Sequence, residues 1–229
     1  MVPKVPGVPE VPRVLLVGAT ELEVTLLRSS GFPIVLSGIG PVNAAYGLTS
    51  YLATHPRPSV VIQTGIAGAY VPAGVPVGSV VLADTEIYGD LGVLTVGGWQ
   101  PMETVGIPVV PAVDGRPARF NYFPLDATLV ARASMIGGSL ITRTGPFLTL
   151  SVITGVRTLG DELHKRFGAL CESMEGGAAA HVCALHDVPF LEVRGISNLV
   201  EDRDRSKWRI NEAAEAAQAV ALKLAENLL

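Results

Sequence analysis

The chain has 229 residues, of which 48% are hydrophobic, and a formal net charge of −4. Its length suits one large α/β domain with a sizeable core, and its acidic balance gives no basic footprint for nucleic acid. The two cysteines, Cys171 and Cys183, show no metal-ligand spacing, so we expect free thiols in the reducing cytoplasm and neither metal nor cofactor. Residues 59–83 carry no charge, but glycine and proline interrupt them throughout, so we expect no membrane-spanning helix.

Proline recurs at positions 3, 6, 9 and 12, a spacing that favours an extended polyproline conformation. We therefore expect a disordered tail over residues 1–12 and one folded domain over residues 13–229. Within the domain, apolar runs of strand type alternate with helical patterns, which predicts a mixed or mostly parallel sheet flanked by helices. The expected strands are residues 14–17, 33–36, 59–63, 77–83, 147–152 and 190–194, and the expected helices are residues 21–28, 44–53, 126–136, 159–167, 176–186 and 211–229.

Two further segments have the composition of loops. Residues 92–119 are rich in glycine, proline and aromatic residues, which is typical of a lid, an oligomer contact or a mobile surface excursion. Residues 201–209 concentrate charges of both signs, which usually indicates a solvated loop.

The first turn after the first strand carries two carboxylates, Glu21 and Glu23. A helix dipole favours carboxylates there, which is a sufficient reason for Glu21, whereas Glu23 also suits a carboxylate that faces a cleft. Phosphate-binding loops offer glycine amides and cations at a helix start. This turn offers two anions and no cation before Arg28, so we expect it to repel phosphate.

A strand–helix–strand unit over residues 171–198 is the segment around which the chain is organised. Glu175 begins an otherwise uncharged helix, and Asn198 follows an apolar strand. In open α/β sheets, ligands bind where strands end, although a helix-start charge and a turn residue would explain these two residues without a ligand. Gly65 and Gly68 follow another strand, where they would let the backbone approach a ligand or simply form a tight turn.

Five motifs, taken together and in this order, resemble the purine nucleoside phosphorylase and nucleosidase superfamily, most closely its methylthioadenosine/S-adenosylhomocysteine nucleosidases. The resemblance covers about residues 14–229. It implies a single α/β domain with a mixed, partly barrel-like sheet, usually assembled as a homodimer or higher homo-oligomer, that acts on a small nucleoside with water. The motifs are GATELEV at 18–24, SGIG at 37–40, TGIAG at 64–68, SME at 173–175 and VRGISN at 193–198.

The resemblance also implies a role for each matching position. Glu23 corresponds to the carboxylate that activates the attacking water, and Glu175 to the one that holds the ribose hydroxyls. Ile153 stands where an aromatic side chain would stack on adenine. The other positions that would line the nucleoside are Ala67, Gly68, Met174, Arg194 and Trp208.

Two departures from the family pattern make the predicted reaction and the predicted base more specific. Gln63 and Ile66 stand where phosphorylases carry arginine and serine for phosphate, which favours hydrolysis. Asn198 replaces the aspartate that donates a proton to purine N7 in the nucleosidases, and it resembles what 6-oxopurine-specific members use.

A 6-oxopurine nucleosidase with an enlarged 5′ side resembles the futalosine hydrolases of the alternative menaquinone pathway. Their substrate is an inosine-like nucleoside that carries a carboxyphenyl ketone at C5′, and its hydrolysis releases hypoxanthine and dehypoxanthine futalosine. Arg203, Arg205 or an arginine of a second subunit would meet the anionic tail. The alternatives are a hydrolase of adenine nucleosides, a phosphorylase and a non-catalytic nucleoside-binding protein.

Overall fold

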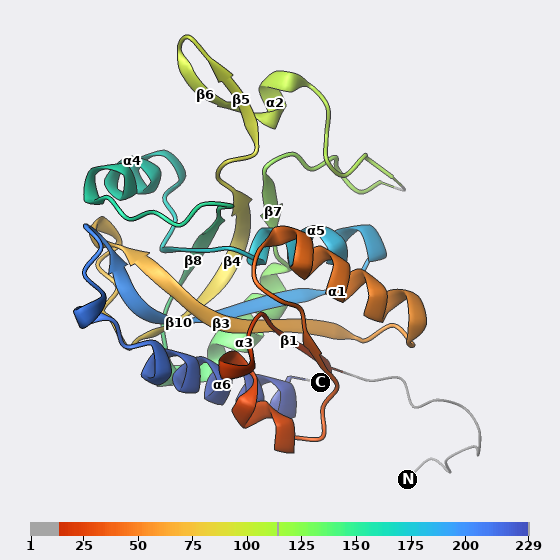
Figure 1. Ribbon diagram of the computed structural model, residues 1–229. Coiled ribbons are helices and arrows are strands. Elements are labelled where there is room, and N and C mark those ends of the chain that lie inside the picture. Colours follow the sequence, from red (N-terminus) through yellow and green to blue (C-terminus); the bar gives the residue numbers. More distant parts are fainter. Residues whose placement is uncertain (1–13, 114, 229) are drawn as a thin grey trace.

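The computed structural model describes residues 14–113 and 115–228. The tail predicted for residues 1–12 lies outside the described residues. The described chain forms a mixed sheet that closes partly into a barrel and is flanked by helices (Figure 1). This confirms the predicted single α/β domain.

Pairing between strands that are distant in the sequence closes the barrel. The path runs β3–β10–β4–β8–β9 and returns to β3, with antiparallel pairs at β10–β4 and β9–β3 and parallel pairs elsewhere on the path. β1 and β2 extend the sheet in parallel from β3, and β7 pairs with β4. The strands are β1 (Val14–Gly18), β2 (Ile34–Leu36), β3 (Val60–Tyr70), β4 (Val80–Tyr88), β7 (Tyr122–Pro124), β8 (Ile141–Thr149), β9 (Cys171–Ser173) and β10 (Phe190–Val200).

Helices cover both faces of the sheet (Figure 1). α1 (Pro41–Thr54) and α5 (Gly176–His186) pack side by side on one face, while α6 (Ile210–Asn227) and α3 (Ala127–Gly137) cover the other. Within the described residues, no helix is both long and apolar enough to cross a bilayer.

The segment predicted as a loop over residues 92–119 contains a small hairpin and one short helix. β5 (Gly92–Thr95) pairs with β6 (Gly98–Pro101), and α2 (Met102–Val105) follows directly. In Figure 1 these elements stand away from the barrel, beyond the ends of β4 and β7.

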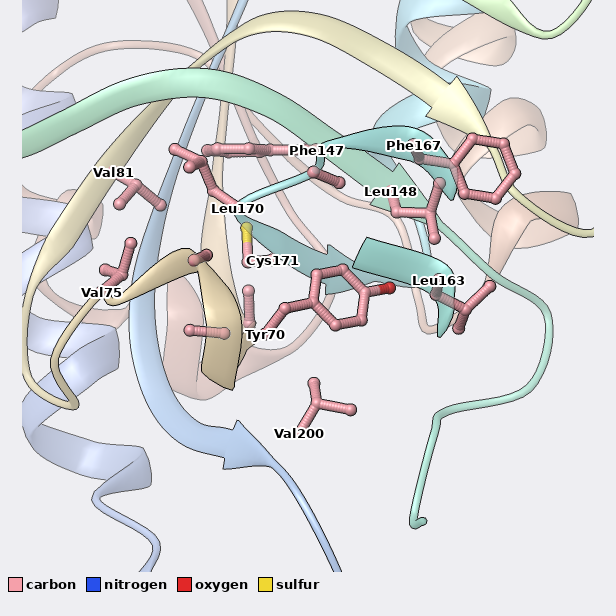
Figure 2. Packing of buried hydrophobic residues seen from close by; sticks show 14 of the residues in the cluster. Tyr70, Val75, Val81, Phe147, Leu148, Leu163, Phe167, Leu170, Cys171 and Val200 are labelled. Atoms are coloured by element: carbon pink, nitrogen blue, oxygen red, sulfur yellow. The ribbon is translucent and has the colours of Figure 1, made fainter. Parts of the chain in front are cut away.

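A hydrophobic core joins the barrel strands to α4 (Arg157–Phe167). Figure 2 shows Tyr70, Phe147 and Leu148 from the strands close to Leu163 and Phe167 from the helix. Residues 60–65 are all buried, because this part of β3 is covered on both faces: Val60–Ile62 supply apolar side chains, and Gln63 and Thr64 are buried polar residues. This core holds rigidly the strand ends that carry the site.

β4 and β8 are displaced from the predicted strands at residues 77–83 and 147–152, and two other strands continue through segments that were predicted as turns or loops. Residues 64–69, expected as a glycine loop, continue β3, and residues 195–198, expected to end a strand, continue β10. The reason is mutual pairing, because residues 194–200 lie in register with residues 65–70 apart from one shift between Ile196 and Asn198.

The helix predicted for residues 21–28 is wrong. Two short 3-10 turns, Glu21–Glu23 and Thr25–Ser29, take its place, with Val24 between them in a non-helical conformation. The Glu23 side chain turns back to accept hydrogen bonds from the Thr20 backbone N–H and hydroxyl, both at 2.9 Å. Because the Glu23 carboxylate accepts these bonds, the turn is tight and the carboxylate points toward the barrel.

Candidate active site

A cavity of 240 Å³ opens where β3, β9 and β10 meet the first turn of the chain and the start of α5. It gathers residues from six separate stretches of sequence. Its lining includes the predicted site residues Glu23, Ala67, Gly68, Ile153, Met174, Glu175, Arg194, Asn198, Arg203 and Trp208.

Arg205 is the predicted site residue that the structure does not place in this cavity. Its side chain is exposed, and its guanidinium lies 5.9 Å from the centre of the Trp208 ring. A larger cavity of 530 Å³ lies elsewhere, between the end of α5 and residues 110–126, and shares no lining residue with the first. The predicted residues therefore point to the smaller cavity as the site.

Glu23 is held at the cavity wall by three hydrogen bonds. Its Oε2 accepts the two bonds from Thr20, and its Oε1 accepts the Ile66 backbone N–H at 2.9 Å. A carboxylate offers about four acceptor positions, so one position remains on Oε1. A water bound there would meet a carboxylate of fixed orientation.

Glu175 occupies the N-cap position of α5, where its side chain makes no capping hydrogen bond, and it is only 5% exposed. Its Oε1 accepts the Gly40 backbone N–H at 2.9 Å, and its Oε2 accepts from Arg194 Nη2 at 3.2 Å. About two acceptor positions remain free. Two free acceptors on a rigid carboxylate match the two hydroxyl donors of a ribose.

Arg194 lies between these carboxylates and is 1% exposed. Besides Glu175, its guanidinium bonds Glu192 Oε1 through Nε at 2.5 Å and the Ile66 carbonyl through Nη1 at 3.1 Å, and Nη1 lies 3.9 Å from Glu23 Oε1. Burial alone would lower the pKa of Arg194, but the surrounding carboxylates outweigh it and raise that pKa above its ordinary value. Arg194 thus holds Glu175 by a hydrogen bond and places a positive charge near Glu23.

Gly65 makes this arrangement possible. A Cβ at this position would clash with Arg194 Nη1 and would lie only 2.6 Å from Glu23 Oε1. The side-chain-free strand position leaves the space in which the guanidinium and the carboxylate meet.

Glu192 and Glu86 extend the cluster into the core, and the sequence analysis missed both. Each is 0% exposed, and desolvation raises the pKa of each carboxyl, most strongly that of Glu86, whose pKa the charge of Glu192 raises further. One signal was available in the sequence, since Glu192 and Arg194 share a face two residues apart in an otherwise apolar strand.

Asn198 is partly exposed to the cavity at the other end of the site. Its Oδ1 accepts the Ser197 hydroxyl at 2.8 Å, and its Nδ2 donates to the Leu199 carbonyl at 3.0 Å. The amide nitrogen has two protons, so one remains for a ligand. The bond from Ser197 sets which way the amide faces.

Glu172 also lines the cavity, and the sequence analysis did not select it. It is 6% exposed and accepts the Thr154 backbone N–H at 2.7 Å and the Tyr70 hydroxyl at 2.9 Å. Desolvation raises its pKa above the ordinary carboxyl value, and these hydrogen bonds oppose the rise. The sequence offered one indication of Glu172, because it is a single acidic residue next to the SME motif.

Trp208 and Arg203 lie together in the cavity lining. The Arg203 guanidinium is 5.4 Å from the centre of the Trp208 ring, within cation–π range. Ile153 and Met174 supply apolar surface to the lining. The lining therefore combines the carboxylates of Glu23 and Glu175, the Asn198 amide with Glu172 nearby, and the aromatic–basic pair, which shares the lining with the acidic residues Glu201, Asp202 and Asp204.

The chain is similar in sequence and in fold to known nucleoside-processing enzymes. A sequence profile described as the Phosphorylase superfamily matches residues 10–228. The chain is 37% identical over 208 residues to the futalosine hydrolase of Streptomyces coelicolor, covering 88% of this chain and 82% of that protein. It is 36% identical over 201 residues to the futalosine hydrolase of Thermus thermophilus, covering 87% and 84%. The solved S-adenosylhomocysteine nucleosidase of Streptococcus pyogenes shares the fold, with a TM-score of 0.76 at 22% identity over 94% of this chain and 97% of that one.

Proposed function

We propose that this chain, which belongs to the phosphorylase superfamily, hydrolyses the N-glycosidic bond of a 6-oxopurine nucleoside, with futalosine as the substrate. The products would be hypoxanthine and dehypoxanthine futalosine, which is a step of menaquinone biosynthesis. One observation carries the proposal: a single cavity holds two fixed carboxylates at one end and the Asn198 amide at the other. The futalosine hydrolases of two bacteria, at 37% and 36% identity, support the choice of substrate.

The acidic end suits the charge that develops on the sugar. Cleavage of an N-glycosidic bond makes the ribose cationic and the departing base anionic, so a site that stabilises this transition state needs anions by the sugar. Glu175 would bind the ribose hydroxyls through its free acceptor positions. Glu23 would take the proton of the attacking water through the acceptor position left on Oε1.

The Asn198 end suits the departing base. The free amide proton can be donated to N7 and O6 of hypoxanthine, where negative charge accumulates as the bond breaks. The bond from Ser197 keeps Oδ1 turned to the protein and leaves Nδ2 as the donor.

The electrostatics of the sugar end favour water over phosphate as the nucleophile. Three carboxylates, those of Glu23, Glu175 and Glu192, surround the one guanidinium of Arg194. Ile66 and the buried Gln63 stand at the positions where a phosphorylase would carry its phosphate ligands. At the sugar end a phosphate dianion would therefore meet a net negative environment, because carboxylates already pair with Arg194.

We expect the reaction to be independent of phosphate. Protein incubated with futalosine, inosine or methylthioadenosine in phosphate buffer should release free base together with the free sugar, at the same rate as in phosphate-free buffer. Chromatography measures the free base and the free sugar, and ³¹P NMR detects any sugar 1-phosphate. A sugar 1-phosphate would overturn the hydrolase assignment, and binding without turnover of any nucleoside would favour a non-catalytic binding protein.

Base preference tests the role of Asn198. Wild-type protein should cleave a hypoxanthine nucleoside faster than the adenine nucleoside with the same 5′ group. The reason is that Asn198 Nδ2 and the 6-amino group of adenine are both hydrogen-bond donors and cannot pair. An unpaired buried polar group costs about 1–3 kcal/mol, or roughly ten- to a hundredfold in kcat/KM. In Asn198→Asp the ionised carboxylate accepts from the 6-amino group and repels O6, so the preference should narrow or invert.

The matched control for this variant is Asn211→Asp, at an exposed position at the start of α6. It adds the same charge outside the cavity and should leave the kcat/KM ratio unchanged. If the ratio in Asn198→Asp equals that of the wild type, Asn198 does not read the base and only caps the strand. A wild-type ratio that favours adenine would instead make a hydrolase of adenine nucleosides the better assignment.

Trp208 and Arg203 are proposed to bind the 5′ substituent. The carboxyphenyl group of futalosine offers an aromatic ring and an anion, and the cavity lining offers an indole ring beside a guanidinium. The guanidinium of Arg205 lies 5.9 Å from the centre of the same ring and would add to the positive potential.

We also propose that the chain works as a homo-oligomer, most simply a dimer, in the cytoplasm. Ile39 lines the cavity and is 57% exposed, and Val42 and Tyr46 on the adjoining turns of α1 are more exposed still. Exposed large apolar side chains next to a site suit a subunit contact. Both cysteines are free and buried, which suits a reducing compartment. Sedimentation velocity measures the assembly state.

A further inference from the structure

Glu172 is a buried carboxylate in the cavity that the proposed chemistry does not use. The Thr154 backbone and the Tyr70 hydroxyl each occupy one acceptor position, on Oε1 and Oε2 respectively. Because a carboxylate has about four such positions, two remain. A buried acceptor with free positions in a ligand cavity needs a donor, which a bound ligand can supply.

Strand pairing places Glu172 and Asn198 on opposite sides of one glycine. Gly68 of β3 pairs with Glu172 of β9 on one side and with Asn198 of β10 on the other. Residues directly paired in a sheet point to the same face, and all three line the cavity. Two interstrand spacings, roughly 9–10 Å in all, separate the two backbones, which leaves room between the side chains for one flat base.

Gly68 has no side chain, so it leaves free space between the Glu172 and Asn198 side chains. A Cβ there would lie 3.2 Å from Asn198 Nδ2 and 3.1 Å from Val200 Cγ2. Along β3 the glycine lies two residues beyond Ile66, whose backbone N–H binds Glu23 at the sugar end. The two positions are roughly 7 Å apart along the strand, which is similar to the distance from the ribose of a nucleoside to the far edge of its purine.

We propose that Glu172 accepts the N1–H of the purine, so that Glu172 and Asn198 recognise adjacent edges of one 6-oxopurine. The proposal rests on the proposed function and names the second residue that selects the base. Hypoxanthine presents a donor at N1 and acceptors at O6 and N7, which complement a carboxylate and an amide N–H. Adenine presents a lone pair at N1, which the carboxylate repels.

The neighbours of Glu172 keep it in the acceptor form. Both of its contacts within the described chain are donors, so neither oxygen needs a proton of its own. Tyr70 cannot easily move, because its ring is buried in the barrel core (Figure 2). Glu172 is thereby oriented before any ligand binds.

The decisive variant is Glu172→Gln, tested with hypoxanthine and adenine nucleosides that share one 5′ group. The amide oxygen can still accept one bond, while the amide nitrogen can donate to adenine N1. We expect kcat/KM for the adenine nucleoside to rise and the hypoxanthine preference to fall tenfold or more. A merely structural role for Glu172 cannot produce a gain on adenine. Wild-type protein should also cleave the N1-methylhypoxanthine nucleoside at least tenfold less efficiently than its parent.

Two further variants complete the experiment. Glu162→Gln removes an exposed carboxylate on α4 and should leave the preference unchanged. Tyr70→Phe removes one donor to Glu172 and should lower the preference by less than Glu172→Gln does. If Glu172→Gln folds, cleaves the hypoxanthine nucleoside and keeps the wild-type preference, the inference is wrong although the hydrolase assignment stands. If wild-type protein cleaves no purine nucleoside, the proposed function itself fails.

Discussion

Replacing Glu23 by glutamine is expected to lower kcat on the nucleoside substrate by about a hundredfold or more, the usual loss when a positioned general base is removed. An amide cannot take the proton of the attacking water. The fold should survive, because a glutamine oxygen can keep the bond from Ile66 or those from Thr20. Steady-state kinetics with release of the free base measures the loss.

Glu175→Gln should show a loss of similar size for a different reason. The amide halves the number of acceptor positions for the ribose hydroxyls and removes the negative charge that stabilises the cationic sugar. The charge acts mainly in the transition state, so kcat should fall more than KM rises.

Glu21→Gln is the matched control for both variants. Glu21 stands in the same turn as Glu23, but its side chain is 60% exposed and pairs with Arg28 at 2.7 Å on the surface. This control should retain the wild-type kcat, since the pair lies outside the cavity. Rates near that of the wild type in both Glu23→Gln and Glu175→Gln would show that the reaction does not occur at this site.

Local patterns predicted the elements that depend on local physics. The helix over residues 176–186 has the predicted bounds, and Asp187 ends it in the left-handed conformation with φ of 55°. The residue types made Glu23, Glu175 and Asn198 candidates, but only the superfamily resemblance gave them expected roles. The superfamily resemblance is confirmed by the profile match over residues 10–228.

Features that depend on pairing between distant strands could not be predicted. The registers of β9 and β10 against β3 decide that Gly68 lies between Glu172 and Asn198, and no local pattern encodes those registers. The 3-10 turns at residues 21–29 follow from a contact between Glu23 and Ile66, which are 43 residues apart. Tertiary contacts override helical periodicity in such a case.

The buried cluster around Arg194 shows which charges hold the site together. Glu192 accepts from Arg194 at 2.5 Å, but both oxygens of Glu86 and Oε2 of Glu192 have no donor among the described groups. Two adjacent carboxylates cannot satisfy each other unless one carries a proton. The raised pKa of Glu86 identifies it as the group that keeps the proton, so Glu192 carries the charge that Arg194 neutralises.

Arg194→Met should therefore be the most destabilising single change in the site. It leaves Glu192 and Glu175 buried without their counter-charge, and removing one partner of a buried ion pair costs about 3–5 kcal/mol. For a domain of this size the melting temperature should fall by roughly 6–20 °C. Thermal unfolding followed by circular dichroism measures the shift. Arg157→Met is the matched control, because the exposed pair of Arg157 with Asp161 on α4 contributes less than about 1 kcal/mol.

Glu86→Gln, unlike Arg194→Met, should not destabilise the protein, because the glutamine amide keeps the hydrogen-bond donor that the protonated carboxyl supplies. Below the ordinary carboxyl pKa, folded and unfolded wild-type protein both hold this proton, so the variant and the wild type should be about equally stable. Above it, the unfolded chain releases the proton while the folded protein keeps it. The free energy of unfolding of the wild type should then fall by up to about 1.4 kcal/mol per pH unit relative to the variant, until the pH passes the raised pKa of folded Glu86. Urea unfolding between pH 5 and pH 8 measures this difference, and a Glu86→Gln protein as unstable as Arg194→Met would show instead that Glu86 is an ionised partner of the arginine.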